Sequence, residues 1–140
     1  MSLFKVFDVA GSALSAQSVR MNTVASNLAN AESASNSPDK VYKAKQPVFA
    51  AVLQASQGEF AGQASYGVQV TGITEKDAEP VARYAPNHPL ADEKGYVFMP
   101  NISTVEEMAN MISASRSYQN NVEVMNTSKQ LLLRTLQLGQ

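Results

Sequence analysis

Apolar and small side chains recur in a heptad pattern along the first third of the chain. The members of this stripe are spaced alternately four and three residues apart: Phe7, Gly11, Leu14, Ser18, Met21, Ala25 and Leu28. Such spacing lines one side of an α-helix that packs against a partner helix. The first proline is Pro38, so no proline interrupts this stretch. The pattern predicts a helix over residues 3–30, about 40 Å long.

A second heptad stripe occupies the last third of the chain. Its members are Met111, Ser115, Tyr118, Val122, Met125, Lys129, Leu132 and Leu136. Ser103 with Glu106 three residues later forms a capping box, which is typical of the start of a helix. Glu106 and Glu107 lie in the first turn, where the helix dipole favours acidic groups. With Gly139 as a suitable stop, we predict a helix over residues 104–138.

Between these two stripes, residues 36–100 have a different pattern and contain all 6 prolines. Segments 67–74 and 96–99 alternate in the period of a β-strand. Segment 41–53 is ambiguous, because Pro47 disfavours a central strand. Two stretches have the composition of loops, 36–39 and 59–65.

The order of these elements predicts an α+β protein that is mainly α. Two long terminal helices joined through a compact β-rich insert fold back most simply as an antiparallel coiled coil. Residues 1–35 and 101–140 would then form one helical core domain, and residues 36–100 an outer segment. The predicted seam between the helices consists of Phe7, Leu14, Met21, Ala25, Leu28, Met111, Tyr118, Val122, Met125, Leu132 and Leu136.

The same helices have further faces without charge. On a helical wheel Thr23, Asn27 and Asn30 lie nearly opposite the N-terminal stripe. The C-terminal helix has a second apolar line, and a helix that is apolar on opposite sides is normally buried. Amides can form hydrogen bonds across a contact without the desolvation cost of charges. We therefore predict contacts with neighbouring subunits through Thr23, Asn27, Asn30, Asn120, Asn121, Val124, Leu131 and Leu138.

Two questions about these faces stay open from the residues alone. The helices could instead form a soluble hairpin with a surface rich in serine and asparagine. Lys129, a charge within the C-terminal stripe, could extend its ammonium group out of the seam or pair with an acidic residue on another chain.

Composition supports a protein whose surface is partly covered by other molecules. Charged residues make up 16% of the 140 residues, against about 25% in typical soluble domains. The net charge of −1 gives no electrostatic footprint for nucleic acid. No stretch reaches the roughly 20 apolar residues that cross a bilayer. The N-terminus does not read as a cleaved signal, because Asp8 interrupts its apolar segment.

Residues that carry chemistry are scarce. The chain has no cysteine, which excludes disulfides, thiolate zinc sites and cysteine nucleophiles. The single histidine, His88, has Asp92 and Glu93 nearby but no second histidine to complete a metal site. No GxSxG, GxGxxG or GxxxxGK[ST] motif occurs. The sequence therefore predicts no catalytic residue, cofactor or metal, and a local packing role for His88.

A small basic and aromatic patch lies in the insert. It consists of Lys40, Tyr42, Lys43 and Lys45. Such a patch can bind an anion or an acidic partner, but more often it is a solvated loop or an edge strand whose lysines discourage pairing. We favour the second interpretation.

Three blocks of sequence resemble one family. SALSAQSVRMNTVASNLANAES (12–33) is similar to the N-terminal signature of the bacterial flagellar rod and hook proteins, with its strongest match at residues 25–30. SRSYQNNVEVMNTSKQLLLRTLQLGQ (115–140) resembles their C-terminal helix. The block at residues 88–122 looks specifically like the members that form the proximal rod.

The resemblance implies a structural subunit that is not an enzyme and needs no cofactor. Members of this family stack helically into a drive shaft that transmits torque, encloses the export channel and crosses the periplasm. Expected partners are further copies, proximal and distal rod subunits, the rod-base adaptor protein and the flagellar type III export apparatus. Export without a cleaved signal is expected too, and neither nucleic-acid binding nor integration into a membrane.

Three other functions are alternatives to a rod subunit. A prefoldin-like chaperone also has terminal helices around a β-rich middle, but it predicts charge-rich helices, whereas Arg20 is the only charge between residues 10 and 30. An exported wall-cleaving hydrolase predicts a cleft with convergent carboxylates. Another axial protein of the same family, such as a rod or hook-junction subunit, is a third alternative.

Overall fold

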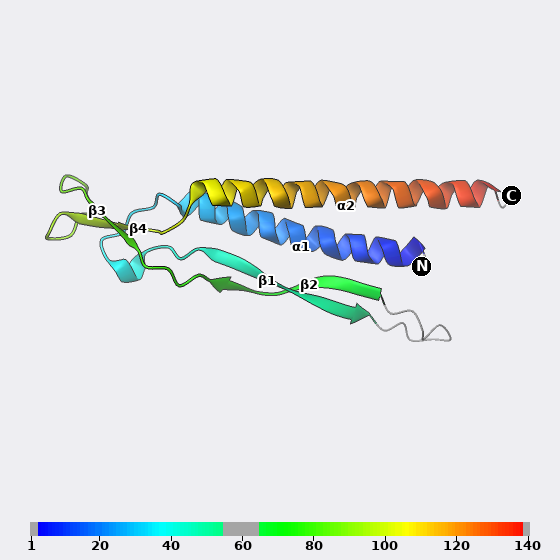
Figure 1. Cartoon of the computed structure of the whole chain (residues 1–140), viewed down its shortest axis with the longest axis horizontal. Coiled ribbons are helices and arrows are strands. Elements are labelled where there is room, and N and C mark those ends of the chain that lie inside the picture. Colours follow the sequence, from blue (N-terminus) through cyan, green and yellow to red (C-terminus); the bar gives the residue numbers. More distant parts are fainter. Residues whose placement is uncertain (1–2, 55–64, 139–140) are drawn as a thin grey trace.

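Two long helices have the extents that the heptad patterns predict. In the computed structural model, which describes residues 3–54 and 65–138, α1 spans Leu3–Asn30 and α2 spans Thr104–Leu138 (Figure 1). The Ser103 hydroxyl accepts a hydrogen bond from the Glu106 N–H at 3.3 Å, which confirms the predicted start of α2. The predicted stop at Gly139 lies outside the described residues.

The middle of the chain forms two antiparallel hairpins, so the fold is α+β and mainly α. A short 3₁₀ helix, η1 (Pro38–Lys40), precedes β1 (Lys45–Gln54), β2 (Ser65–Glu75), β3 (Val81–Tyr84) and β4 (Tyr96–Met99). β1 pairs with β2, and β3 pairs with β4. The strands predicted at 67–74 and 96–99 are confirmed, whereas β3 was not predicted. Of the predicted loop at 59–65, residues 59–64 are outside the described residues and Ser65 begins β2.

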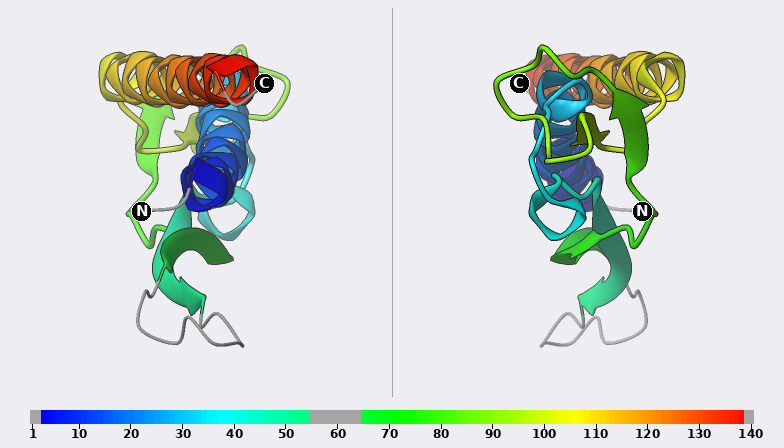
Figure 2. Two further views of the ribbon diagram at one scale, coloured as in Figure 1. Left: turned by 90° about the vertical axis from the view of Figure 1, so that its right-hand side faces the viewer. Right: turned by 90° about the vertical axis from the view of Figure 1, so that its left-hand side faces the viewer.

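The elements lie in three layers along the molecule. α1 and α2 run antiparallel, and the β1–β2 hairpin lies along α1 on the side away from α2 (Figure 1). The β3–β4 hairpin projects beyond the end where α1 finishes and α2 begins. End-on views show α1 between the other two layers (Figure 2). The predicted insert therefore consists of two separate hairpins, one along α1 and one beyond the helix ends.

The β1–β2 hairpin tolerates features that would disrupt a larger sheet. Pro47 pairs with Ile73, and its missing N–H is harmless because both strands of a two-stranded sheet are edges. The register shifts between Val48 and Phe49, where the Thr71 hydroxyl donates to the Val48 carbonyl at 3.2 Å. At one point the hairpin approaches α1 closely, since a Cβ added at Gly67 would lie 3.3 Å from the Ser12 Oγ.

The interior is made of small side chains. Among the described residues, the buried apolar side chains apart from proline are Ala10, Ala16, Val24, Ala31, Val41, Val97 and Ala114. No leucine, isoleucine, methionine or aromatic residue belongs to this set. The largest fully buried side chain is that of Asn27, which is 2% exposed. Small interior residues let the layers approach closely, but they leave most of the large apolar side chains outside the core.

Candidate functional site

The face of α2 that packs on α1 differs from the predicted stripe at alternate positions. One continuous heptad series on α2 is buried or half-buried: Thr104, Glu107, Met111, Ala114, Tyr118, Asn121, Met125, Ser128 and Leu132. Four members of the predicted stripe belong to this series: Met111, Tyr118, Met125 and Leu132. Val122 is half-buried at its margin. Leu136 is 62% exposed, so its prediction as a seam residue was wrong. Lys129, whose place was left open, is exposed outside the buried series.

On α1 the predicted stripe lies at the edge of the buried surface. Its large members, Phe7, Leu14, Met21 and Leu28, are half-buried. Ala25 is exposed, and its prediction as a seam residue was wrong. The physical reason is that α1 has two partners, α2 and the β1–β2 hairpin, so its best-buried positions are those between the two layers. The side that remains exposed carries Asp8, Ser15, Asn22, Ala25 and Ala29.

Asn27 joins three elements through its side-chain amide. Its Nδ2 donates to the Lys45 carbonyl at 2.9 Å and to the Glu107 Oε2 at 3.0 Å. Its Oδ1 accepts from the Lys45 N–H at 2.8 Å and from the Tyr42 hydroxyl at 3.0 Å. Two donors and two acceptor sites are all that an amide offers. The buried polar group is therefore fully satisfied, and it links α1, β1 and α2.

A wider network surrounds this amide. Because the Tyr42 hydroxyl proton goes to Asn27, the Ser26 hydroxyl must donate to the Tyr42 oxygen, 3.0 Å away. On the other side, the Asn110 Nδ2 donates to the Glu107 Oε1 at 3.4 Å, and Arg20 donates to the Asn110 Oδ1 at 3.4 Å. The network continues across the α1–α2 contact and holds Glu107 in place.

Two of the predicted intersubunit residues are instead intrachain groups. Thr23 is 5% exposed and donates to the Val19 carbonyl, while Asn27 has the bonds described above. Their prediction was wrong, because a helical wheel takes account of one partner helix and not of the hairpin that covers the opposite face. Polar side chains on that face therefore meet the backbone of their own chain.

The other predicted contact residues remain available to a partner or lie in local bonds. Asn30 and Asn121 are half-buried and donate to carbonyls one turn earlier, at Ser26 and Ser117. Asn120 is exposed. Val124 and Leu131 are 45% and 50% exposed. The side chain of Leu138 is outside the described residues.

A second heptad series on α2 is mostly exposed, with Ser115 and Val122 half-buried. We call it the flank face, and it consists of Val105, Met108, Ile112, Ser115, Gln119, Val122, Asn126, Lys129, Leu133 and Leu136. Its two ends are apolar: Val105, Met108 and Ile112 are 76%, 57% and 55% exposed, and Leu133 and Leu136 are 49% and 62% exposed. A heptad series is the pattern that a helix presents to another helix. The flank face therefore has the spacing used in helix–helix contacts, with exposed apolar side chains at both of its ends.

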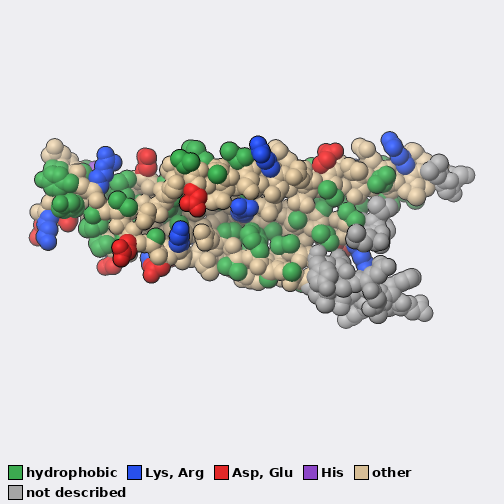
Figure 3. All heavy atoms as spheres, in the orientation of Figure 1, with side chains coloured by type: hydrophobic (Ala, Val, Ile, Leu, Met, Phe, Trp, Pro, Cys, Tyr) green, Lys and Arg blue, Asp and Glu red, His purple; other side chains and the backbone are tan. Residues whose placement is uncertain are grey.

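Four apolar members of the flank face were not predicted as contact residues. They are Val105, Met108, Ile112 and Leu133. Their heptad spacing was readable, but it runs beside the stripe that contains the larger side chains, and only one stripe per helix was assigned to the intrachain seam. In the view of Figure 3, hydrophobic side chains reach the surface over the β3–β4 hairpin and the start of α2, with charges scattered among them.

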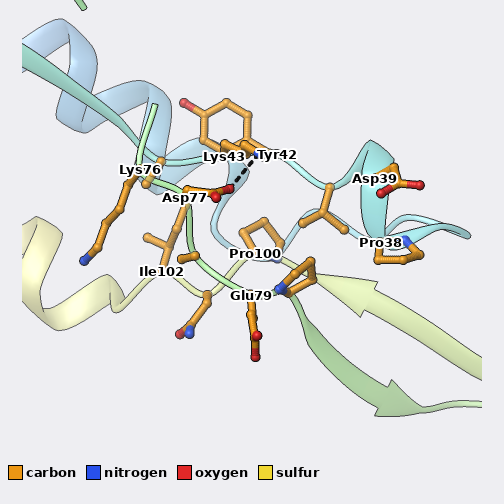
Figure 4. A pocket seen from close by; sticks show the side chains of 14 residues that line it. Pro38, Asp39, Tyr42, Lys43, Lys76, Asp77, Glu79, Pro100 and Ile102 are labelled. Carbon is orange, nitrogen blue, oxygen red and sulfur yellow. Dashed lines mark hydrogen bonds and ion pairs between the residues drawn. The ribbon is translucent and has the colours of Figure 1, made fainter. Parts of the chain in front are cut away.

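A surface cavity of about 280 Å³ lies where three connecting segments meet (Figure 4). Its lining consists of residues 38–39, 41–44, 76–80 and 100–102. At its rim Lys43 Nζ and Asp77 Oδ1 are 2.8 Å apart. This hydrogen bond and the opposite charges raise the pKa of Lys43 and lower that of Asp77. Both groups are solvent-exposed, so the pair is a surface ion pair between the segment before β1 and the segment after β2.

Candidate groups for chemistry do not converge. The exposed His88 accepts a hydrogen bond at Nδ1 from the Leu90 N–H at 3.1 Å. Within residues 3–54 and 65–138, no cluster of three His, Cys, Asp or Glu side chains is arranged to hold a metal ion. The Lys45 ammonium lies 5.7 Å from the centre of the Tyr42 ring, so part of the basic patch packs on its own neighbour.

Within the described residues, neither α1 nor α2 is both long enough and apolar enough to span a membrane.

Comparison with known proteins gives matches over both helices and over the full length. The family described as flagella basal body rod protein matches residues 7–33. The C-terminal family of the flagellar basal body rod FlgEFG proteins matches residues 93–138. The chain is 53% identical over 140 residues to the flagellar basal-body rod protein FlgC of Yersinia enterocolitica, and the match covers 100% of both chains.

Two further relatives have the same description. The FlgC protein of Escherichia coli O157:H7 is 52% identical over 140 residues, again with 100% of both chains covered. That of Bacillus subtilis is 37% identical over 150 residues, with 99% of each chain covered.

Proposed function

The chain belongs to the family of flagellar basal-body rod proteins FlgC, and we infer that it is a structural subunit of the bacterial flagellar basal-body rod. Its location is accordingly the basal body of the flagellum. These relatives give no support to a prefoldin-like chaperone. The first two of them match this chain from end to end, so the inference applies to the whole chain and not to one segment.

The observation that carries this function physically is the position of the large apolar side chains. Ala and Val fill the core, whereas the apolar start of the flank face and three leucines near the end of α2 meet solvent, namely Leu131, Leu133 and Leu136. Exposed apolar groups in such numbers favour association with other protein surfaces. A subunit that is complete only within an assembly is expected to have this distribution.

We propose that α1 and α2 form an antiparallel coiled coil that serves as the core unit of the subunit. The heptad series from Thr104 to Leu132 supports this pairing. Residues 1–35 and 101–140 would move as one unit, and the β1–β2 hairpin would stiffen it by covering α1. The β3–β4 hairpin would add lateral contacts.

Intersubunit contacts would use the flank face together with Asn120, Val124, Leu131 and Leu138. A helical assembly repeats heterologous contacts, in which different patches of two copies meet. Two exposed lines on α2, one on the flank face and one through Val124 and Leu131, suit such an arrangement. Many weak contacts of this kind, repeated around a shaft, would transmit torque without any catalytic step.

The remaining partners follow from the same proposal. The subunit would contact other copies of itself, proximal and distal rod subunits and the rod-base adaptor protein. The flagellar type III export apparatus would deliver it to a growing rod in the periplasm, where the finished shaft would enclose the export channel.

The decisive experiment replaces Leu136 by Asp in a strain that lacks the resident copy of this gene. We expect loss of swimming and absence of the subunit from purified basal bodies, because the new carboxylate would be desolvated in the contact. The isolated variant should keep its stability to within about 0.5 kcal/mol, as is usual for an exposed position.

A matched control is Gln137→Asp, which adds the same charge at the neighbouring exposed position. This side chain lies away from the flank face, so swimming should persist. Normal assembly of the Leu136→Asp variant would contradict the proposed contact surface. Loss of assembly in both variants would show that the effect of the charge is not specific to the flank face.

A further inference from the structure

The position of Asn27 has a consequence for how the helices align. Its amide contacts the Glu107 carboxylate on α2 and the backbone of Lys45 on β1. We propose that Asn27 selects the register in which α1, α2 and β1 pack, and that the apolar contacts alone leave this register undetermined.

Packing between the helices repeats after one heptad. On the buried series of α2, large side chains occur at Met111, Tyr118, Met125 and Leu132, and small or polar ones at Ala114, Asn121 and Ser128. Apart from Asn27, the buried positions of α1 form two heptad-related pairs, Ala10 with Val24 and Ala16 with Thr23, and none of these side chains is larger than valine. A shift of α2 by seven residues, about 10 Å, therefore places large side chains where large ones were. Van der Waals packing discriminates poorly between the two alignments.

Hydrogen bonding does discriminate between them. In the observed register Asn27 lies opposite Glu107, which accepts its hydrogen bond at 3.0 Å. After a one-heptad shift the residue opposite Asn27 would be Ala114, whose methyl group accepts nothing. A buried donor would lose its partner, and a buried amide without a partner is costly. Single buried asparagines set register in coiled coils for the same reason.

The chain connections permit such a shift. Residues 31–34 lead from α1 into the hairpin region, and residues 100–103 lead back to α2. Four residues span up to about 13 Å when extended. A one-heptad displacement of about 10 Å would use most of this reach, so the connections limit the shift without defining the register, and side-chain contacts select it.

Asn27 aligns β1 by a separate route. Both backbone groups of Lys45 bond to the amide, the N–H to Oδ1 and the carbonyl to Nδ2. Lys45 stands opposite Glu75 in the hairpin, and its free edge faces α1. The amide therefore acts as one residue of a partner strand would, and it fixes which residue of β1 lies beside Asn27. One side chain thereby aligns three elements.

Disulfide trapping measures the register directly, because the chain has no cysteine of its own. Counting two heptads along each helix from Asn27 and Glu107 gives Ala13 and Asn121 as an opposed pair in the observed register. After the shift Ala13 would oppose Ser128. Two double variants of the full chain, Ala13→Cys with Asn121→Cys and Ala13→Cys with Ser128→Cys, report the two alignments after mild oxidation.

With Asn27 present, the first pair should cross-link at least about tenfold more than the second, the ratio expected for one unmade buried hydrogen bond. Asn27→Ala should bring the two yields to within about threefold. Asn30→Ala is the matched control, since Asn30 bonds only to the Ser26 carbonyl of its own helix, and it should keep the original ratio.

Glu107→Leu provides a second variant if Asn27→Ala does not fold. It removes only the acceptor on α2 and leaves the bonds of Asn27 to Lys45 and Tyr42. It should lower the ratio in the same way, whereas Glu107→Gln, which keeps an acceptor oxygen, should restore it. Unchanged ratios in Asn27→Ala and Glu107→Leu would overturn the proposal. None of these measurements requires assembly, so they stand or fall separately from the proposed rod function.

Discussion

The two ends of this molecule differ in the polar contacts that hold them together. At the junction end, where α1 finishes and α2 begins, polar side chains point inward and are satisfied within the chain. Asn27 makes four hydrogen bonds there, and Ser35 and Phe98 exchange backbone hydrogen bonds of 2.8 and 2.9 Å. At the terminal end, where α1 begins and α2 finishes, Leu131, Leu133 and Leu136 point outward.

This difference separates what the chain stabilises by itself from what it leaves to partners. Buried hydrogen bonds with defined partners favour one arrangement of the junction end. The exposed leucines of the terminal end, like Val105, Met108 and Ile112 at the start of α2, form apolar surface that only a neighbouring molecule can remove from water. The ends differ because the junction end also has the buried hydrogen bonds of Asn27. A subunit of this design can hold a defined shape at one end and adapt to its neighbours at the other. Substitutions at the two ends should therefore change the stability of the isolated chain to different extents.

The largest effect is expected at Asn27. Replacing it by alanine leaves buried groups of Lys45, Tyr42 and Glu107 without their partner, each of which costs free energy. We expect a loss of roughly 2–4 kcal/mol in the free energy of unfolding, measured by urea denaturation. Asn30→Ala should change it by less than about 0.5 kcal/mol, because that side chain has only a local bond. Equal losses of unfolding free energy in Asn27→Ala and Asn30→Ala would contradict the special role of the Asn27 hydrogen bonds.

A second effect at the junction end concerns Gly95. Its φ of 81° is in the left-handed region, and an added Cβ would lie 3.0 Å from the Tyr84 Cε2 and 3.2 Å from the Pro86 Cβ. Gly95→Ala should therefore destabilise the chain by about 1–2 kcal/mol, lowering its Tm. A Tm equal to that of the unchanged chain would indicate that the turn between β3 and β4 is loosely packed.

At the terminal end a glycine should behave in the opposite way. Gly11 lies within α1, and a Cβ there would meet no atom within 4 Å. Gly11→Ala should stabilise the isolated chain by about 0.5–1 kcal/mol, since alanine is the better helix former. Thermal unfolding followed by circular dichroism tests this. A lower Tm would mean that the terminal end is already closely packed in the free chain.

The smallest effect should come from the exposed pair Lys43 and Asp77. The pKa of Asp77 is lowered, so its contribution to stability is complete above its ordinary value of 3.8 and disappears as the pH falls through the lower folded value. The pKa of Lys43 is raised, so its part persists below 10.5 and disappears as the pH rises through the higher folded value.

Comparing Asp77→Asn with the unchanged chain isolates this contribution. The variant should be slightly less stable at pH 7, and the difference should vanish at pH 2. Because both side chains are in solvent, added salt should reduce the difference. A difference that grows in acid would show that another group governs this region.

Sequence patterns predicted the elements better than their contacts. Heptad spacing and the Ser103 cap located both helices, because those signals are local. β3 was not predicted because Val81–Tyr84 is short, follows Pro80 and has no alternation of apolar and polar residues. Its strand conformation depends on pairing with β4, which begins more than ten residues later.

Asn27 could not be assigned correctly for a related reason. Its partners, Tyr42, Lys45 and Glu107, are 15 or more residues away along the chain. An amide on a helix looks the same in sequence whether it faces water, a neighbouring subunit or its own hairpin. The exposed ends of the flank face were visible as a periodicity, but which of two adjacent heptad series packs inside depends on the hairpin that covers α1.

Hydrogen exchange on the purified, unassembled chain tests most directly whether the terminal end needs neighbouring subunits to become stably ordered. Fraying alone affects about one turn at a helix end, so residues 121–134 of α2 are the informative part. We predict strong protection of amides 108–118 and a progressive loss of protection from residue 121 onward. If amides 121–134 exchange as slowly as 108–118, the terminal end is complete without partners and this account of the subunit is wrong.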